Sequence, residues 1–212
     1  MEPDFWRARW ENNQIGFHEG KPNALLQRHL GALALAPGAR IFLPLCGKTR
    51  DIAFLLAQGF RVAGAELSRL AVEQLFAELE VAPVVSVHGP LERFSAPGVD
   101  IFVGDIFALG GDLLGPVDAV YDRAALVALP APLRARYAPH LVEITAGAPQ
   151  LLITFEYDQS LVEGPPFSIP PAETRALYGA DYLVALLESA VVAGGLRGKC
   201  EATEHAWLME RG

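Results

Sequence analysis

The segment from Arg40 to Leu67, RIFLPLCGKTRDIAFLLAQGFRVAGAEL, constrains the fold of this chain more than any other segment. Its two ends, 40–46 and 61–67, are mostly apolar, as expected of strands that are covered on both faces. The residues between them carry apolar side chains at helical spacing, and Gly59 is suited to end that helix. Strand, helix and strand in this order predict one unit of a parallel sheet with a right-handed crossover.

The same alternation continues through the middle of the chain. We predict a helix at 68–79, with Ser68 as its N-cap, and then strands at 100–107, 117–123 and 149–158. The amphipathic segment LRARYAPHLVEIT lies between the last two strands and is predicted as their crossover helix. Strands that alternate with helices in this way predict an α/β fold.

The two ends of the chain are less regular. PAETRALYG predicts a short helix, YLVALLESAVV fits either a helix or a strand, and EHAWLMER (204–211) predicts a closing antiparallel strand. The N-terminal residues predict a helix, a loop and a second helix from about Asn23, which does not fit the alternation. Since there is no repeat or linker, we expect one domain over residues 1–212, with residues 1–38 as a helical cap.

Charge and composition exclude several classes of protein. The formal net charge of -8 argues against binding of nucleic acid, and no apolar run reaches the roughly 18 residues of a membrane span. Cys46 and Cys200 match no disulfide or zinc spacing, so we expect a reduced protein without a metal site. The N-terminal residues are charged and aromatic, unlike a signal peptide, which predicts a cytoplasmic location.

The turn after the first strand limits the ligand. A dinucleotide fingerprint places three glycines there, whereas this turn has only Gly47, between the bulky Leu45 and Lys48. Glu66, however, follows Gly47 at the offset of about 20 residues that suits an acid on a ribose diol. A ligand with a ribose and no phosphate, such as S-adenosylmethionine, fits both observations. The alternative is that Glu66 only ends a strand and caps the next helix.

Four segments in order, WRARWENNQIGFHEG, FLPLCGKTRDIAFLLAQGFRVAGAELS, DRAALVALP and GPPFSIP, together resemble the thiopurine S-methyltransferase family. The resemblance covers nearly the whole chain. It implies a Rossmann-like class I methyltransferase fold, in which a mostly parallel seven-stranded sheet carries helices on both faces. It also implies S-adenosyl-L-methionine as cofactor and methyl transfer to the sulfur, selenium or tellurium of a small acceptor.

The resemblance also implies site residues. Trp10 matches a cap residue over the cofactor, although it could instead be a packing residue, and Arg123 matches an arginine where cofactor and acceptor meet. The implied cofactor contacts are Trp10, Leu45, Glu66, Asp105, Ile106 and Arg123.

For the acceptor, the resemblance implies Phe17 as a pocket aromatic. Phe167, in the proline-rich segment after the fifth strand, is either part of a rigid turn or a pocket wall. We take Arg123 as the catalytic candidate, with a salt bridge to Asp122 or Asp118 as the structural alternative. Since acidic thiols ionise readily, we expect no strong general base.

Two other functions stay open on the sequence. The first is a nicotinamide-dependent reductase that uses Glu66 on a ribose, and the second is a non-catalytic nucleoside-binding module. The glycine-poor turn argues against the reductase, and the combined presence of Trp10, Glu66, Asp105 and Arg123 argues against the module. We expect a monomer.

Overall fold

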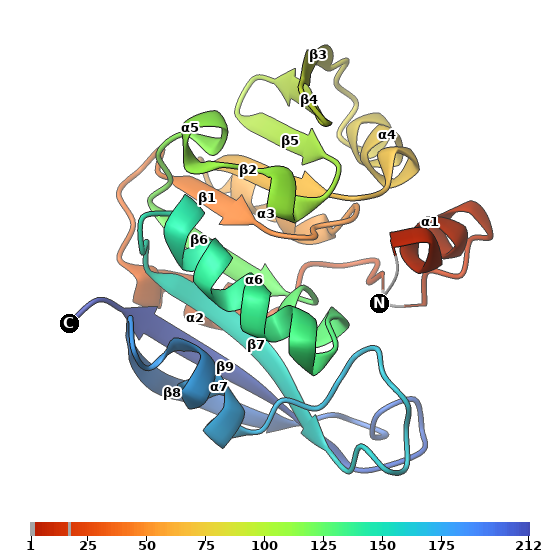
Figure 1. Cartoon of the computed structure of the whole chain (residues 1–212), viewed down its shortest axis with the longest axis vertical. Helices are drawn as coiled ribbons and strands as arrows, with labels where there is room; N and C mark the ends of the chain where they lie inside the picture. The colour runs from red at the N-terminus through yellow and green to blue at the C-terminus, as the bar shows by residue number, and fades with distance from the viewer. Residues whose placement is uncertain (1–2, 17) are drawn as a thin grey trace.

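The computed structural model describes residues 3–16 and 18–212. They form one sheet in the order β3-β4-β5-β2-β1-β6-β7-β9-β8, which runs from the top to the bottom of Figure 1. The five central strands, β5 to β7 in this order, are parallel, and the outer strands are antiparallel to their neighbours. The strands are β1 (Arg40–Leu43), β2 (Arg61–Glu66), β3 (Val84–His88), β4 (Leu91–Ala96), β5 (Val99–Val103), β6 (Ala119–Arg123), β7 (Gln150–Tyr157), β8 (Leu183–Val191) and β9 (Ala202–Glu210).

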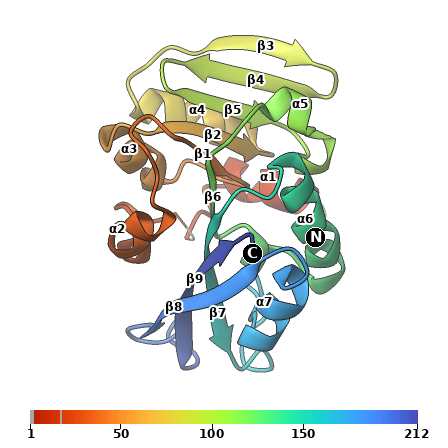
Figure 2. The same ribbon diagram turned by 90° about the vertical axis from the view of Figure 1, so that its left-hand side faces the viewer.

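Helices cover both faces of the sheet, as predicted, and Figure 2 shows the two layers. On one face α5, α6 and α7 contribute to a core cluster that includes Phe42 and Trp207. On the other, α2, α3 and α4 pack over a cluster that includes Ile41 and Tyr121. The helices are α1 (Pro3–Glu11), α2 (Ala24–His29), α3 (Arg50–Ala57), α4 (Arg69–Glu78), α5 (Gly111–Leu114), α6 (Ala131–Ile144) and α7 (Pro171–Tyr178), with single turns η1 (Leu30–Leu33), η2 (Ile106–Ala108) and η3 (Leu126–Ala128).

The first strand–helix–strand unit is confirmed in detail. The Thr49 side chain accepts a hydrogen bond from the amide of Asp51 and begins α3, and Gly59 follows its end with a φ of +85°. A positive φ costs glycine little, which explains its use as a helix stop. Ser68 caps α4 as predicted, since its hydroxyl accepts from the amide of Ala71.

The prediction of seven strands is wrong, because the sheet has nine. The two additional strands, β3 and β4, form an antiparallel hairpin on the β5 edge. All but one of the residues of β3 are exposed, so its sequence, VVSVH, lacks the apolar and polar alternation that marks a half-buried strand. The segment YLVALLESAVV, which the sequence left undecided, contains strand β8, and β9 is the expected closing antiparallel strand.

The N-terminal residues form two helices, as predicted. The side chain of Asn23 caps α2, accepting from the amides of Leu25 and Leu26. Helix α1 lies on the side toward which the β1 and β2 arrows point in Figure 1, and it contacts α4. Among the described residues, no helix has both the length and the apolar character needed to cross a bilayer.

Candidate cofactor and acceptor site

Glu66 ties together the turns after β1 and β2. One carboxylate oxygen accepts the amide of Gly47 at 2.8 Å, and the other accepts the amide of Ser68 at 2.7 Å. Burial raises the pKa of the Glu66 carboxyl, and these backbone hydrogen bonds oppose the rise. The acid ends β2 and holds both turns together. The structural alternative is thus right that Glu66 ends a strand, but the side chain that caps α4 is that of Ser68. Each oxygen of the Glu66 carboxylate still has acceptor capacity for a hydroxyl.

Trp10 of α1 lies directly over Gly47. A Cβ atom added to Gly47 would stand 2.9 Å from Cζ2 of the Trp10 ring, closer than real contacts allow. Gly47 also has a φ of +53°, and Trp10 is buried. The lack of a side chain at Gly47 thus lets the Trp10 ring lie against this turn. This packing explains why the turn has a glycine at this one position.

Leu45 occupies an unusual backbone conformation in the same turn. Its φ of +46° lies in the left-handed region, which costs a residue with a branched side chain roughly 1–2 kcal/mol. Its side chain packs against the core cluster beneath α6. Backbone strain of this kind is common where a turn is shaped for a ligand.

Asp105 and Ile106 follow β5 at the same edge of the sheet, next to Glu66, whose carbonyl accepts the amide of Gly104 at 2.9 Å. Asp105 is exposed and caps η2 by accepting from the amide of Phe107. The Ile106 side chain is buried in the core, and its carbonyl oxygen lies 2.8 Å from Nε2 of His140. His140 was not predicted, because nothing in its local sequence indicates this contact.

Arg123 ends β6 and forms an ion pair with Glu19 of the N-terminal segment. The expected structural alternative, a salt bridge to Asp118 or Asp122, is wrong. Asp118 accepts the amide of Arg40 at 2.6 Å, and Asp122 faces the other way, into the core. Glu19 was missed by the sequence analysis, although it stands in the FHEG motif.

Asp122 fixes the turn that follows Arg123. Its carboxylate accepts the hydroxyl of Tyr137 at 2.7 Å and the amide of Leu126 at 3.1 Å. Burial raises the pKa of Asp122 from 3.8 to about 6. Ala124, the next residue after Arg123, adopts a φ of +64°, the region that glycine favours.

The acceptor candidates are only partly described. Phe17 lies outside the described residues. Phe167 is half-buried in the segment after β7, where its amide donates to the Val127 carbonyl at 2.6 Å and its ring lies against Gly164. Arg197 donates to the carbonyl of Pro165, so it holds the same loop. These contacts account for a rigid turn, and the pocket-wall role of Phe167 stays a prediction.

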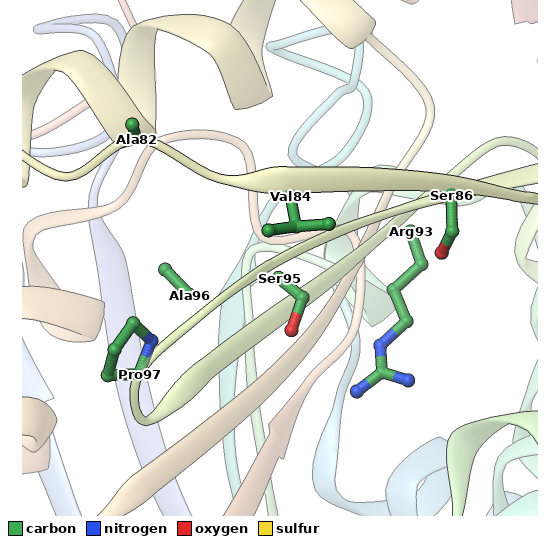
Figure 3. Close-up of a pocket in the computed structure, with 7 residues that line it drawn as sticks. All are labelled: Ala82, Val84, Ser86, Arg93, Ser95, Ala96 and Pro97. Carbon is green, nitrogen blue, oxygen red and sulfur yellow. The ribbon is translucent and has the colours of Figure 1, made fainter.

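The structure thus places Trp10 and Glu66 on the same residue, Gly47: the Trp10 ring packs on it, and Glu66 accepts its amide. Arg123 is linked to the N-terminal segment by its ion pair with Glu19. A hollow of about 550 Å³ lies elsewhere, over the β3–β4 hairpin (Figure 3). Its one charged side chain, Arg93, forms an ion pair with Asp100, and none of the predicted site residues lines it.

Comparison with known proteins agrees with this geometry. The family model described as thiopurine S-methyltransferase matches residues 1–211. A thiopurine S-methyltransferase of Xanthobacter autotrophicus is 70% identical over 212 residues, covering 100% of both chains. One from Gluconobacter oxydans is 51% identical over 203 residues, covering 96% of this chain and 92% of the relative.

Solved structures show the same fold at 13% identity. An S-adenosylmethionine-dependent methyltransferase from Anabaena variabilis superimposes with a TM-score of 0.65, covering 99% of this chain and 95% of the other. Magnesium protoporphyrin IX methyltransferase from Synechocystis, with bound S-adenosylhomocysteine, gives a TM-score of 0.60 with 99% and 100% coverage. Neither the reductase nor the non-catalytic module is supported by these relatives. The chain belongs to the thiopurine S-methyltransferase family, and it is a methyltransferase that uses S-adenosylmethionine.

Proposed function

We propose that this methyltransferase acts on a small thiol, or on a selenium or tellurium compound, at the edge where β1, β2 and β6 end. The observation that carries the proposal is Arg123, a cation at that edge that the N-terminal segment covers with Glu19. A fixed guanidinium can hold an anionic acceptor by charge-assisted hydrogen bonds.

The cofactor contacts are also proposals. The remaining lone pairs of the buried Glu66 carboxylate suit two ribose hydroxyls, and the second oxygen of Asp105 suits the amino group of adenine. Leu45 and Ile106 supply apolar walls, and Trp10 covers the Gly47 turn. When bound, S-adenosylmethionine supplies the methyl group from its sulfonium.

The protein then has little covalent work to do. We propose that Arg123 aligns the acceptor, that Phe17 and Phe167 line its pocket, and that the cap of residues 1–38 excludes water. Alignment of this kind supplies up to roughly 7–11 kcal/mol in favourable cases. A thiolate is already the reactive species, so no side chain is assigned as general base.

We further propose that residues 1–212 act as one cytoplasmic domain and as a monomer. The net charge of -8 supports the monomer, since it opposes self-association. Sedimentation velocity at two protein concentrations tests this, and a sedimentation coefficient that rises with concentration would refute it.

A methyl-transfer assay tests the proposed acceptor. The protein is supplied with labelled S-adenosylmethionine and a panel of aromatic thiols, aliphatic thiols, selenite and tellurite. We expect label on at least one of these acceptors, and Glu66→Gln should raise the KM for the cofactor at least tenfold. No label on any acceptor of this panel, by a protein that still binds S-adenosylhomocysteine, would refute the acceptor class.

A further inference from the structure

Two carboxylates interact with the charge of Arg123: Glu19 forms an ion pair with it, and Glu204 is close enough for the charge of Arg123 to lower the pKa of its carboxyl. Glu19 lies in the segment between α1 and α2, and its side chain is 46% exposed although it pairs with Arg123. The Arg123 side chain is only 12% exposed. Water can therefore solvate the carboxylate of Glu19 when it leaves Arg123, whereas the largely buried guanidinium needs another anion in its place.

The second carboxylate, Glu204, belongs to β9 opposite Phe155. Burial raises the pKa of its carboxyl, the charge of Arg123 lowers it, and Glu19 raises it again. Glu204 is fixed in the sheet by the β7 and β8 ladders. Of the two acids, Glu19 is therefore the one that another anion can replace at Arg123.

We propose that Glu19 is a specificity-determining residue, an internal competitor for Arg123 that disfavours acceptors carrying a carboxylate. The proposal rests on the proposed function, in which Arg123 faces the acceptor. A carboxylate on the acceptor and the carboxylate of Glu19 bind the same guanidinium, so the first must displace the second. An acceptor whose only charge is its thiolate offers Arg123 a single sulfur instead of two carboxylate oxygens, so its affinity depends much less on this exchange.

The segment around Glu19 allows the exchange. Gly20 directly follows Glu19. The helices on either side of this segment, α1 and α2, are held by contacts that do not involve the ion pair between Glu19 and Arg123. Trp10 packs over Gly47, and Asn23 caps α2 while its amide donates to Asp51 at 2.7 Å. Glu19 can therefore turn to solvent while the two helices keep their places.

Steady-state kinetics with two matched aromatic thiols test the proposal. The acceptors are 4-mercaptobenzoate and 4-methylbenzenethiol, which differ in the carboxylate, and the enzymes are the wild type, Glu19→Gln and Glu143→Gln. Glu143 is an exposed acid of α6 outside the proposed site, so its variant controls for the change in net charge. We expect Glu19→Gln to lower the KM for 4-mercaptobenzoate about fivefold, while the KM for 4-methylbenzenethiol changes less than twofold.

Titration of each enzyme, loaded with S-adenosylhomocysteine, with 4-methylbenzoate gives a readout without catalysis. Binding should tighten about fivefold in Glu19→Gln and stay unchanged in Glu143→Gln. The proposal is overturned if both thiols respond equally to Glu19→Gln, which would make the ion pair a positioning contact of the cap. It is also overturned if the affinity for S-adenosylhomocysteine changes instead. A wild type that binds the cofactor product but methylates neither thiol refutes the acceptor class itself.

Discussion

At the scale of single residues, Arg123 is the side chain on which the proposed chemistry depends. Its partner Glu19 is 104 positions away in the sequence, so no local pattern could predict the pair. The resemblance to the thiopurine S-methyltransferase family predicted Arg123 because this residue lies within the motif DRAALVALP. The motif does not indicate which acidic residue pairs with Arg123. The motifs thus suffice to propose Arg123 as a site residue, whereas its contact with a distant segment could be found only in the fold.

Removal of Arg123 should impair catalysis more than folding. We expect Arg123→Ala to lower kcat more than tenfold at saturating cofactor, because the charge that aligns the acceptor is lost. Arg61→Ala is the matched control, since Arg61 is exposed at the opposite, amino end of β2. Thermal melts check that both variants are folded. An unchanged kcat in Arg123→Ala would remove this residue from the mechanism.

Asp122 should give the stability of the protein a specific dependence on pH. Since its pKa rises from 3.8 to about 6 on folding, the folded state binds the proton more tightly than the unfolded state. Its contribution to the free energy of unfolding is therefore largest below pH 4, falls between about pH 4 and 6, and is flat above. The full effect is about 3 kcal/mol at most.

Urea denaturation of the wild type and Asp122→Asn at pH 4, 5, 6 and 7 measures this contribution. Other carboxyl groups titrate in the same range, so the quantity of interest is the difference between the two proteins at each pH. The wild type should lose about 2–3 kcal/mol relative to the variant between pH 4 and pH 7. A difference that stays constant would show that Asp122 keeps an ordinary pKa.

At the scale of elements, what could be predicted depended on burial. Strands β1, β2, β5, β6 and β7 are buried in the centre of the sheet, so their sequences are apolar and stand out. Strand β3 is an exposed edge, and its register is set by the β4 ladder rather than by a buried face. Such a strand leaves little trace in the hydrophobic pattern, which is why the hairpin was missed.

The packing of α1 on the β1–α3 turn leads to a paired prediction. Gly47→Ala places a methyl group 2.9 Å from the Trp10 ring at a φ of +53°, whereas Gly38→Ala has a similar φ of +77° and no atom within 4 Å. Both variants should lose about 1 kcal/mol of stability from the backbone conformation. Only Gly47→Ala should also displace the cap.

Calorimetric titration with S-adenosylhomocysteine separates the two effects. We expect Gly47→Ala to weaken binding at least tenfold, because Trp10 can no longer lie over the turn, and Gly38→Ala to bind as the wild type does. Equal affinities in the two variants would mean that the contact between Trp10 and Gly47 packs the cap without serving the cofactor.

At the scale of the whole molecule, binding of the cofactor should stabilise the fold, because Glu66 joins two turns of the central sheet. At about 100 times its Kd, a ligand that binds only the folded state adds about 2.7 kcal/mol to the free energy of unfolding. For a chain of this size, that raises the melting temperature by about 5–10 °C.

S-adenosylhomocysteine should produce this shift and NAD should not, since the Gly47 turn has no room for a pyrophosphate under Trp10. In Glu66→Gln one carboxylate oxygen becomes an amide nitrogen, which donates hydrogen bonds and can accept neither the backbone amide nor a ribose hydroxyl. The shift should therefore shrink in Glu66→Gln and persist in Glu143→Gln, and an equal shift with NAD would contradict the assignment of the cofactor.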